Sequence, residues 1–91
     1  MNSAELASSF INAGFKAILT CVDSFAMDGV FAGRLYDREF LSELPEEVDP
    51  CGENGEFNTF VFDGPLFRKP IWFQKGETIL RDNRFFFCDF F

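Results

Sequence analysis

Histidine is absent from this chain of 91 residues, and its three cysteines form no Cys-x-x-Cys pair. The cysteines stand far apart, at positions 21, 51 and 88. A structural zinc site and a His-dependent catalytic triad both need side chains that this sequence lacks. We therefore expect reduced thiols, a cytoplasmic location and no metal site built from these residues.

Basic residues are scarce as well, because 8 Lys and Arg stand against 15 Asp and Glu, for a net charge of −7. Binding to nucleic acids or anionic membranes needs clustered cations, and only Arg68 and Lys69 are adjacent. No apolar run approaches the roughly 18 residues of a membrane span. The first residues also lack the basic start of a signal peptide. We expect neither nucleic acid nor a membrane as a partner.

The seven glycines include no adjacent pair. Nucleotide-binding loops hold phosphates with backbone N–H groups of glycine-rich turns. No such cradle can be built from this sequence.

The residues that are present predict one α+β domain covering residues 1–91. Helical periodicity and an N-terminal cap at Asn2, with Ser3 as the competing cap, predict a helix over residues 3–13, ended by Gly14. Residues 16–22 are apolar on both alternations, as in a buried strand of a parallel sheet. Asp37 is expected to cap a short second helix that Pro45 ends.

The second half predicts a mixed, mostly antiparallel sheet that ends in a meander. One strand covers residues 57–62, and another, over 71–74, should turn at Lys75-Gly76 into residues 77–81. Asp82-Asn83 should then turn the chain into the strand 84–91. That last strand is rich in Phe on both faces, which favours either core packing or an exposed apolar face that awaits a partner.

An acidic loop, residues 46–56, precedes the strand at 57–62 and carries Glu53 and Glu56 three residues apart. Paired carboxylates can hold a hard cation, an ammonium or an amide N–H, or can share a proton. The plainer interpretation is a solvated acidic turn. Cys51 lies among these carboxylates, so we expect a poorly reactive thiol that serves packing or a backbone contact.

The stretch Asp49-Pro-Cys-Gly-Glu-Asn-Gly-Glu-Phe, followed by Thr59-Phe-Val-Phe-Asp-Gly-Pro65, resembles a known family. It is similar to the C-terminal half of PP-loop ATP pyrophosphatases of the diphthine–ammonia ligase type, in their bacterial form. The resemblance implies an enzyme that activates a carboxylate as an adenylate with ATP and Mg²⁺, and then forms an amide with ammonia. Bacteria do not make diphthamide, so the bacterial likeness implies a different carboxylate.

The same resemblance implies the site residues. Glu53 and Glu56 are the catalytic candidates, and the substrate-binding candidates are Arg34, Gly52, Asn54, Gly55, Asn58, Thr59 and Asp63. The sequence departs from the pattern at position 58, where Asn replaces a His that suits proton transfer near neutral pH. Arg34 could meet a phosphate, pair with the acidic loop or be an ordinary surface cation.

We therefore expect the substrate-side half of an ATP-dependent carboxylate–ammonia ligase, inactive alone and without tight binding of ATP. The alternative is a non-catalytic oligomeric binding or assembly module that retains the fold. Expected partners are a separate PP-loop domain or further copies joined through the Phe-rich C-terminal strand.

Overall fold

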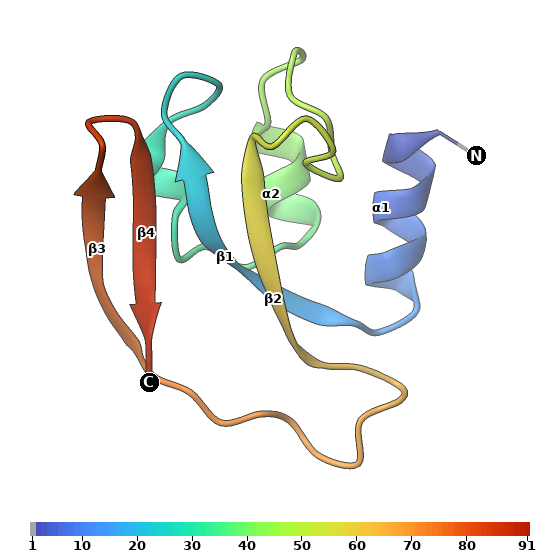
Figure 1. The fold of residues 1–91 in the computed structure, drawn as a ribbon. Helices are drawn as coiled ribbons and strands as arrows, with labels where there is room; N and C mark the ends of the chain where they lie inside the picture. The colour runs from blue at the N-terminus through green and yellow to red at the C-terminus, as the bar shows by residue number, and fades with distance from the viewer. Residues whose placement is uncertain (1) are drawn as a thin grey trace.

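The fold, known from a computed structural model, is described over residues 2–91. Its helices are α1 (Ser3–Asn12), the 3-10 turn η1 (Gly29–Phe31) and α2 (Arg38–Glu43). Its strands are β1 (Lys16–Asp23), β2 (Phe57–Asp63), β3 (Lys75–Arg81) and β4 (Phe85–Phe90). The strands form one sheet in the order β2-β1-β4-β3, as Figure 1 shows. The predicted α+β class is confirmed.

Every pair of neighbouring strands in this sheet is antiparallel, so the mostly antiparallel sheet is confirmed and the parallel pairing inferred for residues 16–22 is wrong. β1 is apolar on both faces because it is a central strand with cover on each side. Leu19 and Val22 enter the main core, whereas Ile18 aligns with Phe60 of β2 on the other face. Burial on both faces is therefore decided by position in the sheet and not by strand direction.

Helix α1 begins and ends as its sequence predicts. The backbone N–H of Glu5 donates to Oδ1 of Asn2 at 2.8 Å, which satisfies one of the free donors of the first turn. Gly14 follows the helix with φ +95°, a conformation that other residues rarely adopt. Ala7 is buried against the core.

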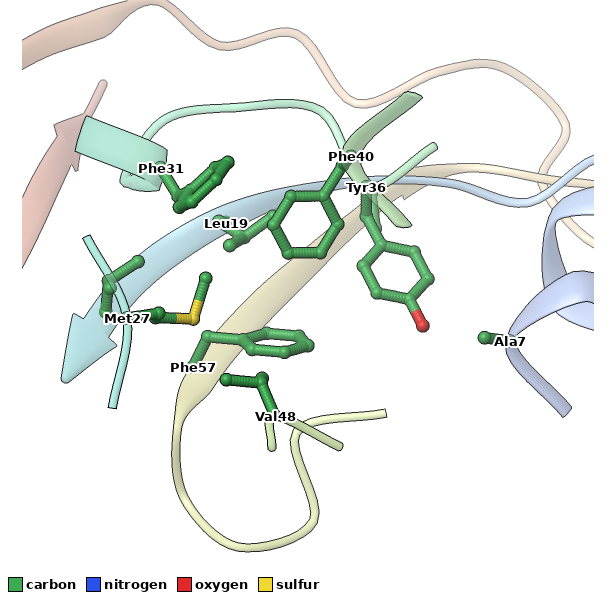
Figure 2. Packing of buried hydrophobic residues seen from close by; sticks show 10 residues of the cluster. Ala7, Leu19, Met27, Phe31, Tyr36, Phe40, Val48 and Phe57 are labelled. Carbon is green, nitrogen blue, oxygen red and sulfur yellow. The ribbon is translucent and has the colours of Figure 1, made fainter. Parts of the chain in front are cut away.

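The main core is aromatic and lies between the sheet and α2 (Figure 2). The ring of Phe40, from α2, is fully buried and meets Phe31 and Phe57 edge to face, with centroids 5.5 Å apart in both pairs. Tyr36 packs beside it at 5.7 Å. Asp37 holds α2 in place by accepting the backbone N–H of Phe40, as predicted for its cap.

The hairpin of β3 and β4 is confirmed at one turn and corrected at the other. Asp82 and Asn83 have φ of 54° and 52°, which two-residue hairpin turns require. The predicted turn at Lys75-Gly76 is wrong, because both residues lie inside β3. Gln74 already exchanges two backbone hydrogen bonds of 3.0 Å with Phe91, so pairing with the end of the chain begins one residue earlier.

Residues 71–74 accordingly form no strand of a meander, and they belong to an irregular connection between β2 and β3. The Phe-rich β4 lies inside the sheet, between β1 and β3. Phe86 and Phe90 are half-buried and Cys88 is buried, whereas Phe87 and Phe91 remain exposed. No helix among residues 2–91 is long and apolar enough to cross a membrane.

Candidate functional site

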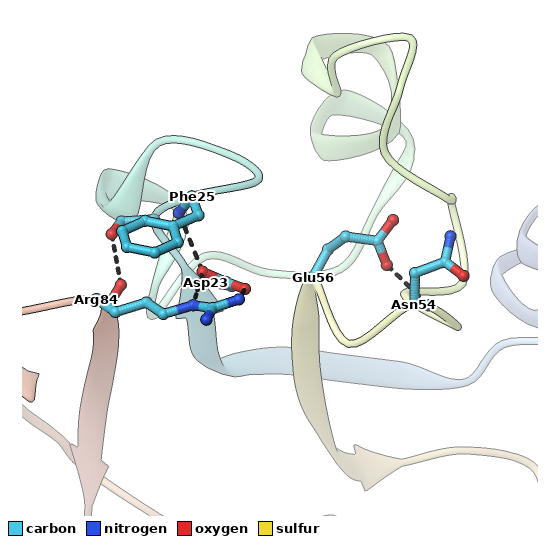
Figure 3. A network of polar contacts seen from close by, with 6 residues as sticks. Asp23, Phe25, Asn54, Glu56 and Arg84 are labelled. Atoms are coloured by element: carbon cyan, nitrogen blue, oxygen red, sulfur yellow. Dashed lines mark hydrogen bonds and ion pairs between the residues drawn. The ribbon is translucent and has the colours of Figure 1, made fainter. Parts of the chain in front are cut away.

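Glu56 fixes the acidic loop by accepting hydrogen bonds from the loop's own backbone. Its Oε2 accepts the N–H of Asp49 at 2.8 Å, and its Oε1 accepts the N–H of Asn54 at 2.9 Å. The residue is only 6% exposed. Its carbonyl oxygen also accepts the N–H of Asp23, at the end of β1 (the side chains are drawn in Figure 3). Glu56 therefore holds the loop closed and attaches it to the sheet.

Asp49 organises the other half of the loop in the same way. Its Oδ2 accepts the backbone N–H groups of Cys51 at 3.0 Å and of Glu53 at 3.1 Å. The Ser3 hydroxyl and the N–H of Glu53 hold the pKa of Asp49 below its ordinary value. The carboxylate of Asp49 thus accepts hydrogen bonds from the loop backbone, as the carboxylate of Glu56 does.

Two glycines supply the backbone geometry between these carboxylates. Gly52 and Gly55 have φ of +66° and +79°, a backbone conformation that residues with a side chain rarely adopt. A Cβ at position 52 would also lie 2.9 Å from the carbonyl oxygen of Phe57. No atom outside the neighbouring residues lies within 4 Å of a Cβ placed at position 55.

Glu53 differs from the other two acids because its carboxylate points to solvent. Its backbone N–H is used by Asp49, but its side chain joins no ion pair among residues 2–91. The residue is exposed at the tip of the loop. Of the three acids Asp49, Glu53 and Glu56, Glu53 is therefore the one whose carboxylate can meet a ligand without breaking a loop hydrogen bond.

An apolar pocket of about 310 Å³ lies beside the loop, between α1 and β2. Its walls include Leu6, Phe10 and Val61, and Thr59 and Cys51 contribute polar atoms. Burial and then the charges of Asp49 and Glu53 raise the pKa of the Cys51 thiol. Its Sγ lies 3.4 Å from the carbonyl oxygen of Ser3, so the predicted backbone contact of this thiol is confirmed.

Tyr36 also shapes this pocket, and no signal in the sequence indicates its role. Its hydroxyl donates to the carbonyl oxygen of Pro50 at 2.6 Å, which connects the core to the acidic loop. Burial raises the pKa of Tyr36 well above its usual range, so the hydroxyl remains a proton donor. In the sequence, Tyr36 is indistinguishable from any other core aromatic residue. Only the structure shows that its hydroxyl reaches Pro50.

Comparison with known proteins gives a consistent family. Residues 2–88 match the family described as diphthamide synthase C-terminal domain. The chain belongs to this family. Among curated relatives, it is 38% identical over 87 residues to a diphthine–ammonia ligase of Danio rerio, covering 90% of this chain and 34% of that protein. It is 31% identical to the diphthine–ammonia ligase of Homo sapiens, covering 87% of this chain and 32% of that protein.

A fission yeast relative, the diphthine–ammonia ligase of Schizosaccharomyces pombe, is 30% identical over 79 residues. That match covers 82% of this chain and 13% of the relative. The chain thus spans about a third of the length of the fish and human relatives, and less of the yeast one. The predicted likeness to the C-terminal part of diphthine–ammonia ligases is confirmed.

The structure places the predicted family site residues in several separate regions. Gly52, Glu53, Asn54, Gly55 and Glu56 form the loop, and Thr59 lines the adjoining pocket. Asn58 is exposed and faces away from the core, because neighbouring strand residues point to opposite faces and Phe57 is buried. Its carbonyl oxygen accepts the hydroxyl of Thr20 at 3.3 Å.

Asp63 and Arg34 lie outside this group. Asp63 ends β2, roughly 20 Å along the strand from Phe57, and its Oδ1 accepts the N–H of Gly64 at 2.8 Å. Arg34 forms an ion pair of 2.6 Å with Glu43 of α2, and its guanidinium lies over the ring of Phe31. Arg34 therefore pairs with α2 and not with the acidic loop, which was one of the alternatives that the sequence left open.

The residues of the loop do not fit a tightly held Mg²⁺, which the family resemblance implies for the complete enzyme. Asp49 and Glu56 already accept two backbone N–H groups each. Among residues 2–91, no group of three or more His, Cys, Asp or Glu side chains is placed to hold a metal ion. A hard cation needs several oxygen ligands, and Glu53 alone provides one carboxylate.

Proposed function

We propose that this chain is the substrate-side part of an ATP-dependent carboxylate–ammonia ligase, in which the acidic loop forms one wall of the active site. The family membership supports a ligase, and its relatives are named diphthine–ammonia ligases. The nucleotide is expected to be held elsewhere, by a separate PP-loop domain. The chain by itself is proposed to be inactive, with no tight binding of ATP.

The observation that carries this proposal is the different state of three carboxylates within residues 49–56, those of Asp49, Glu53 and Glu56. Asp49 and Glu56 fix the backbone, and Glu53 is presented to solvent at the tip of a loop that cannot easily change shape. An exposed carboxylate on a backbone fixed by hydrogen bonds suits the binding of ammonia through a hydrogen bond and the removal of its proton. We assign the direct contact with substrate or ammonia to Glu53 and a positioning role to Glu56.

The pocket beside the loop suggests where the carbon chain of a carboxylate substrate lies. Thr59 and Cys51 provide a hydroxyl and a thiol, and the remaining walls are largely apolar. Asn54 and Gly55 are exposed in the loop, and Gly52 is half-buried beside Phe57. Asn58, Asp63 and Arg34 lie on other surfaces, and a role in substrate binding would need the PP-loop domain to reach them.

The experiment is an assay of pyrophosphate release with ATP, ammonium and a panel of carboxylates that includes diphthine. We expect release only when the chain is mixed with a PP-loop domain of the family. Glu53→Gln should lower the rate of the mixture about a hundredfold, as the loss of an acid–base group does. Glu47→Gln is the matched control, because Glu47 is exposed in the same loop and lies outside the site.

Two results would count against the proposal. One is a mixture that releases no pyrophosphate with any carboxylate, and the other is a Glu53→Gln chain as active as the native one. Calorimetric titration of the isolated chain with ATP and Mg²⁺ should show no binding. Tight binding there would contradict the assignment of the nucleotide to another domain.

A non-catalytic binding or assembly module is the second candidate. It is favoured by the use of both Asp49 and Glu56 for backbone hydrogen bonds, which leaves one free acid where the sequence predicts a pair. Absence of any effect of Glu53→Gln in an active mixture would support it. For either function we propose a cytoplasmic location, since Cys21, Cys51 and Cys88 are unpaired thiols that suit a reducing compartment.

A further inference from the structure

The connection between β2 and β3, residues 64–74, differs in charge from the rest of the chain. It contains Arg68 and Lys69 and no acidic residue, although the whole chain carries a net charge of −7. It also carries two of the most exposed apolar side chains, Leu66 at 87% and Trp72 at 93%. A basic and apolar segment on an acidic protein is a typical composition for a contact with an acidic surface.

Trp72 is held outward by the anchoring of both its neighbours. The N–H of Ile71 donates to the carbonyl oxygen of Phe62 at 2.8 Å. The ring of Phe73 packs against Phe60, Phe62 and Phe90, with centroids 5.1 to 5.8 Å apart. The indole is therefore presented on a supported backbone, which lowers the entropy lost when it is bound.

The apolar pocket between α1 and β2 is the surface that complements this segment. Its volume of about 310 Å³ lies at the lower end of the range for ligand pockets, and its walls are mostly apolar. Cys51 lines it, and the carboxylate of Asp49 accepts the backbone N–H groups of Cys51 and Glu53, so the acidic loop borders the pocket. Nothing among the described residues fills this space.

Trp72 cannot reach the pocket of its own chain. Phe73 holds the connection against Phe60 and Phe62, on one face of β2. The pocket is lined by Thr59 and Val61, which point to the opposite face because side chains alternate along a strand. Any contact between the two surfaces must therefore join separate molecules.

We propose that Trp72 of one copy inserts into the α1–β2 pocket of a second copy, with Arg68 and Lys69 beside the carboxylates of its acidic loop. Trp and Arg are the residues that most often dominate binding energy at interfaces. The two surfaces differ and lie on opposite faces of the sheet, so the contact is head-to-tail and can add further copies. The contact does not rest on the ligase activity proposed above, but Trp72 would occupy the pocket assigned there to the carbon chain of the substrate, so the two occupants exclude each other.

Sedimentation and fluorescence of the native chain test the contact directly, because Trp72 is the single tryptophan. We expect association that grows with protein concentration, weakens with added salt and moves the Trp72 emission to shorter wavelength. Trp72→Ala should weaken association on the order of tenfold or more. Phe91→Ala is the matched control, since Phe91 is 77% exposed at the Phe-rich end of the chain, and it should leave association unchanged.

A mixing experiment distinguishes this contact from a symmetric one. Thr59→Phe fills the pocket but keeps Trp72, and Trp72→Ala keeps the pocket but removes the side chain that enters it. Each variant alone should be monomeric, and the mixture should form a one-to-one complex with blue-shifted Trp72 emission. If Thr59→Phe fails to fold, Glu53→Lys replaces it, and its weakened association should be restored by a partner that carries Lys69→Glu.

Three results would overturn the proposal. The first is a monomeric native chain at all concentrations reached, and the second is a mixture that forms no complex. The third is loss of association in Phe91→Ala but not in Trp72→Ala, which would assign the contact to the C-terminal strand. Emission that shifts only with vesicles of anionic and neutral lipids would assign the segment to membranes and would equally refute a second copy as its partner.

Discussion

The carboxylate of Glu56 accepts the backbone N–H of Asp49 across the acidic loop, at 2.8 Å. Asp49 in turn accepts the N–H groups of Cys51 and Glu53, so the acids of the loop mainly shape its backbone. Two of the negative charges of the loop, those of Asp49 and Glu56, thus serve to hold its backbone. What remains for a ligand is the exposed carboxylate of Glu53 and the apolar pocket beside it.

Replacing Glu56 should destabilise the fold as well as the loop. Glu56→Ala removes the acceptor of two N–H groups at a buried position, and we expect a loss of about 2–4 kcal/mol in the free energy of unfolding. Urea unfolding followed by circular dichroism measures it. Glu53→Gln is the control and should change stability by less than about 0.5 kcal/mol, because its side chain is exposed. Equal effects of the two substitutions would contradict the structural role of Glu56.

The two loop glycines should differ in their tolerance of alanine. Gly55→Ala meets only the strain of positive φ and should cost about 1–2 kcal/mol. Gly52→Ala meets the same strain and also places its Cβ 2.9 Å from the Phe57 carbonyl oxygen, so its cost should be clearly larger. Thermal unfolding of the two variants side by side gives the comparison. A smaller effect at position 52 would mean that the loop relaxes away from Phe57.

The ion pair of Asp23 and Arg84 should make stability depend on pH in the acid range. The guanidinium of Arg84 donates to both Asp23 oxygens, at 2.9 and 2.7 Å (Figure 3), and holds the pKa of Asp23 below its ordinary value of 3.8. A carboxylate whose pKa is lowered on folding stabilises the fold above its unfolded pKa. That contribution is lost as the pH falls through the folded value.

Urea midpoints of the native chain and Asp23→Asn, measured from pH 7 down to pH 2, test this linkage. The difference between the two chains should stay constant at neutral pH and shrink as the pH falls below about 4. Asp28→Asn is a suitable control, because Asp28 is exposed and joins no ion pair among the described residues. A difference between the native chain and the Asp23→Asn variant that persists unchanged at the lowest pH would contradict the pairing.

Phe40 should be the most sensitive position of the core. It is fully buried and packs against Phe31, Tyr36 and Phe57, so Phe40→Ala leaves a cavity that the surrounding rings cannot fill. We expect a loss of about 3–5 kcal/mol, which is comparable with the whole stability of so small a domain. Phe40→Leu should cost clearly less. If Phe40→Ala keeps the circular dichroism spectrum and the unfolding midpoint of the native chain, Phe40 is not the central residue of the core.

Local signals in the sequence predicted the helices and one of the turns correctly. The Asn2 cap, the Asp37 cap and the Asp82-Asn83 turn each depend on residues a few positions apart, and each is present in the structure. The error at Lys75-Gly76 has a different cause. Whether this pair turns or continues depends on Gln74 pairing with Phe91, seventeen positions away in the sequence, and no local signal encodes that pairing.

The sequence predicted the acidic loop but not the contacts that its side chains make. The spacing of Glu53 and Glu56 suggests two equivalent acids, yet burial against β1 directs one to the backbone and leaves the other exposed. Arg34 is drawn to Glu43 because α2 lies within reach of it, and this proximity follows from packing of the core. Side-chain partners of this kind are set by three-dimensional distance.

The sequence by itself determined the α+β class, the helix limits, the acidic loop and the family resemblance, because these follow from local composition, capping and motif. The tertiary structure decided the antiparallel order β2-β1-β4-β3, the assignment of Glu56 to the loop backbone, and the separation of Trp72 from its own pocket. The physical reason is that burial and pairing across the sheet depend on contacts between distant segments. Such contacts form only once the whole chain has packed around Phe40 and its aromatic neighbours.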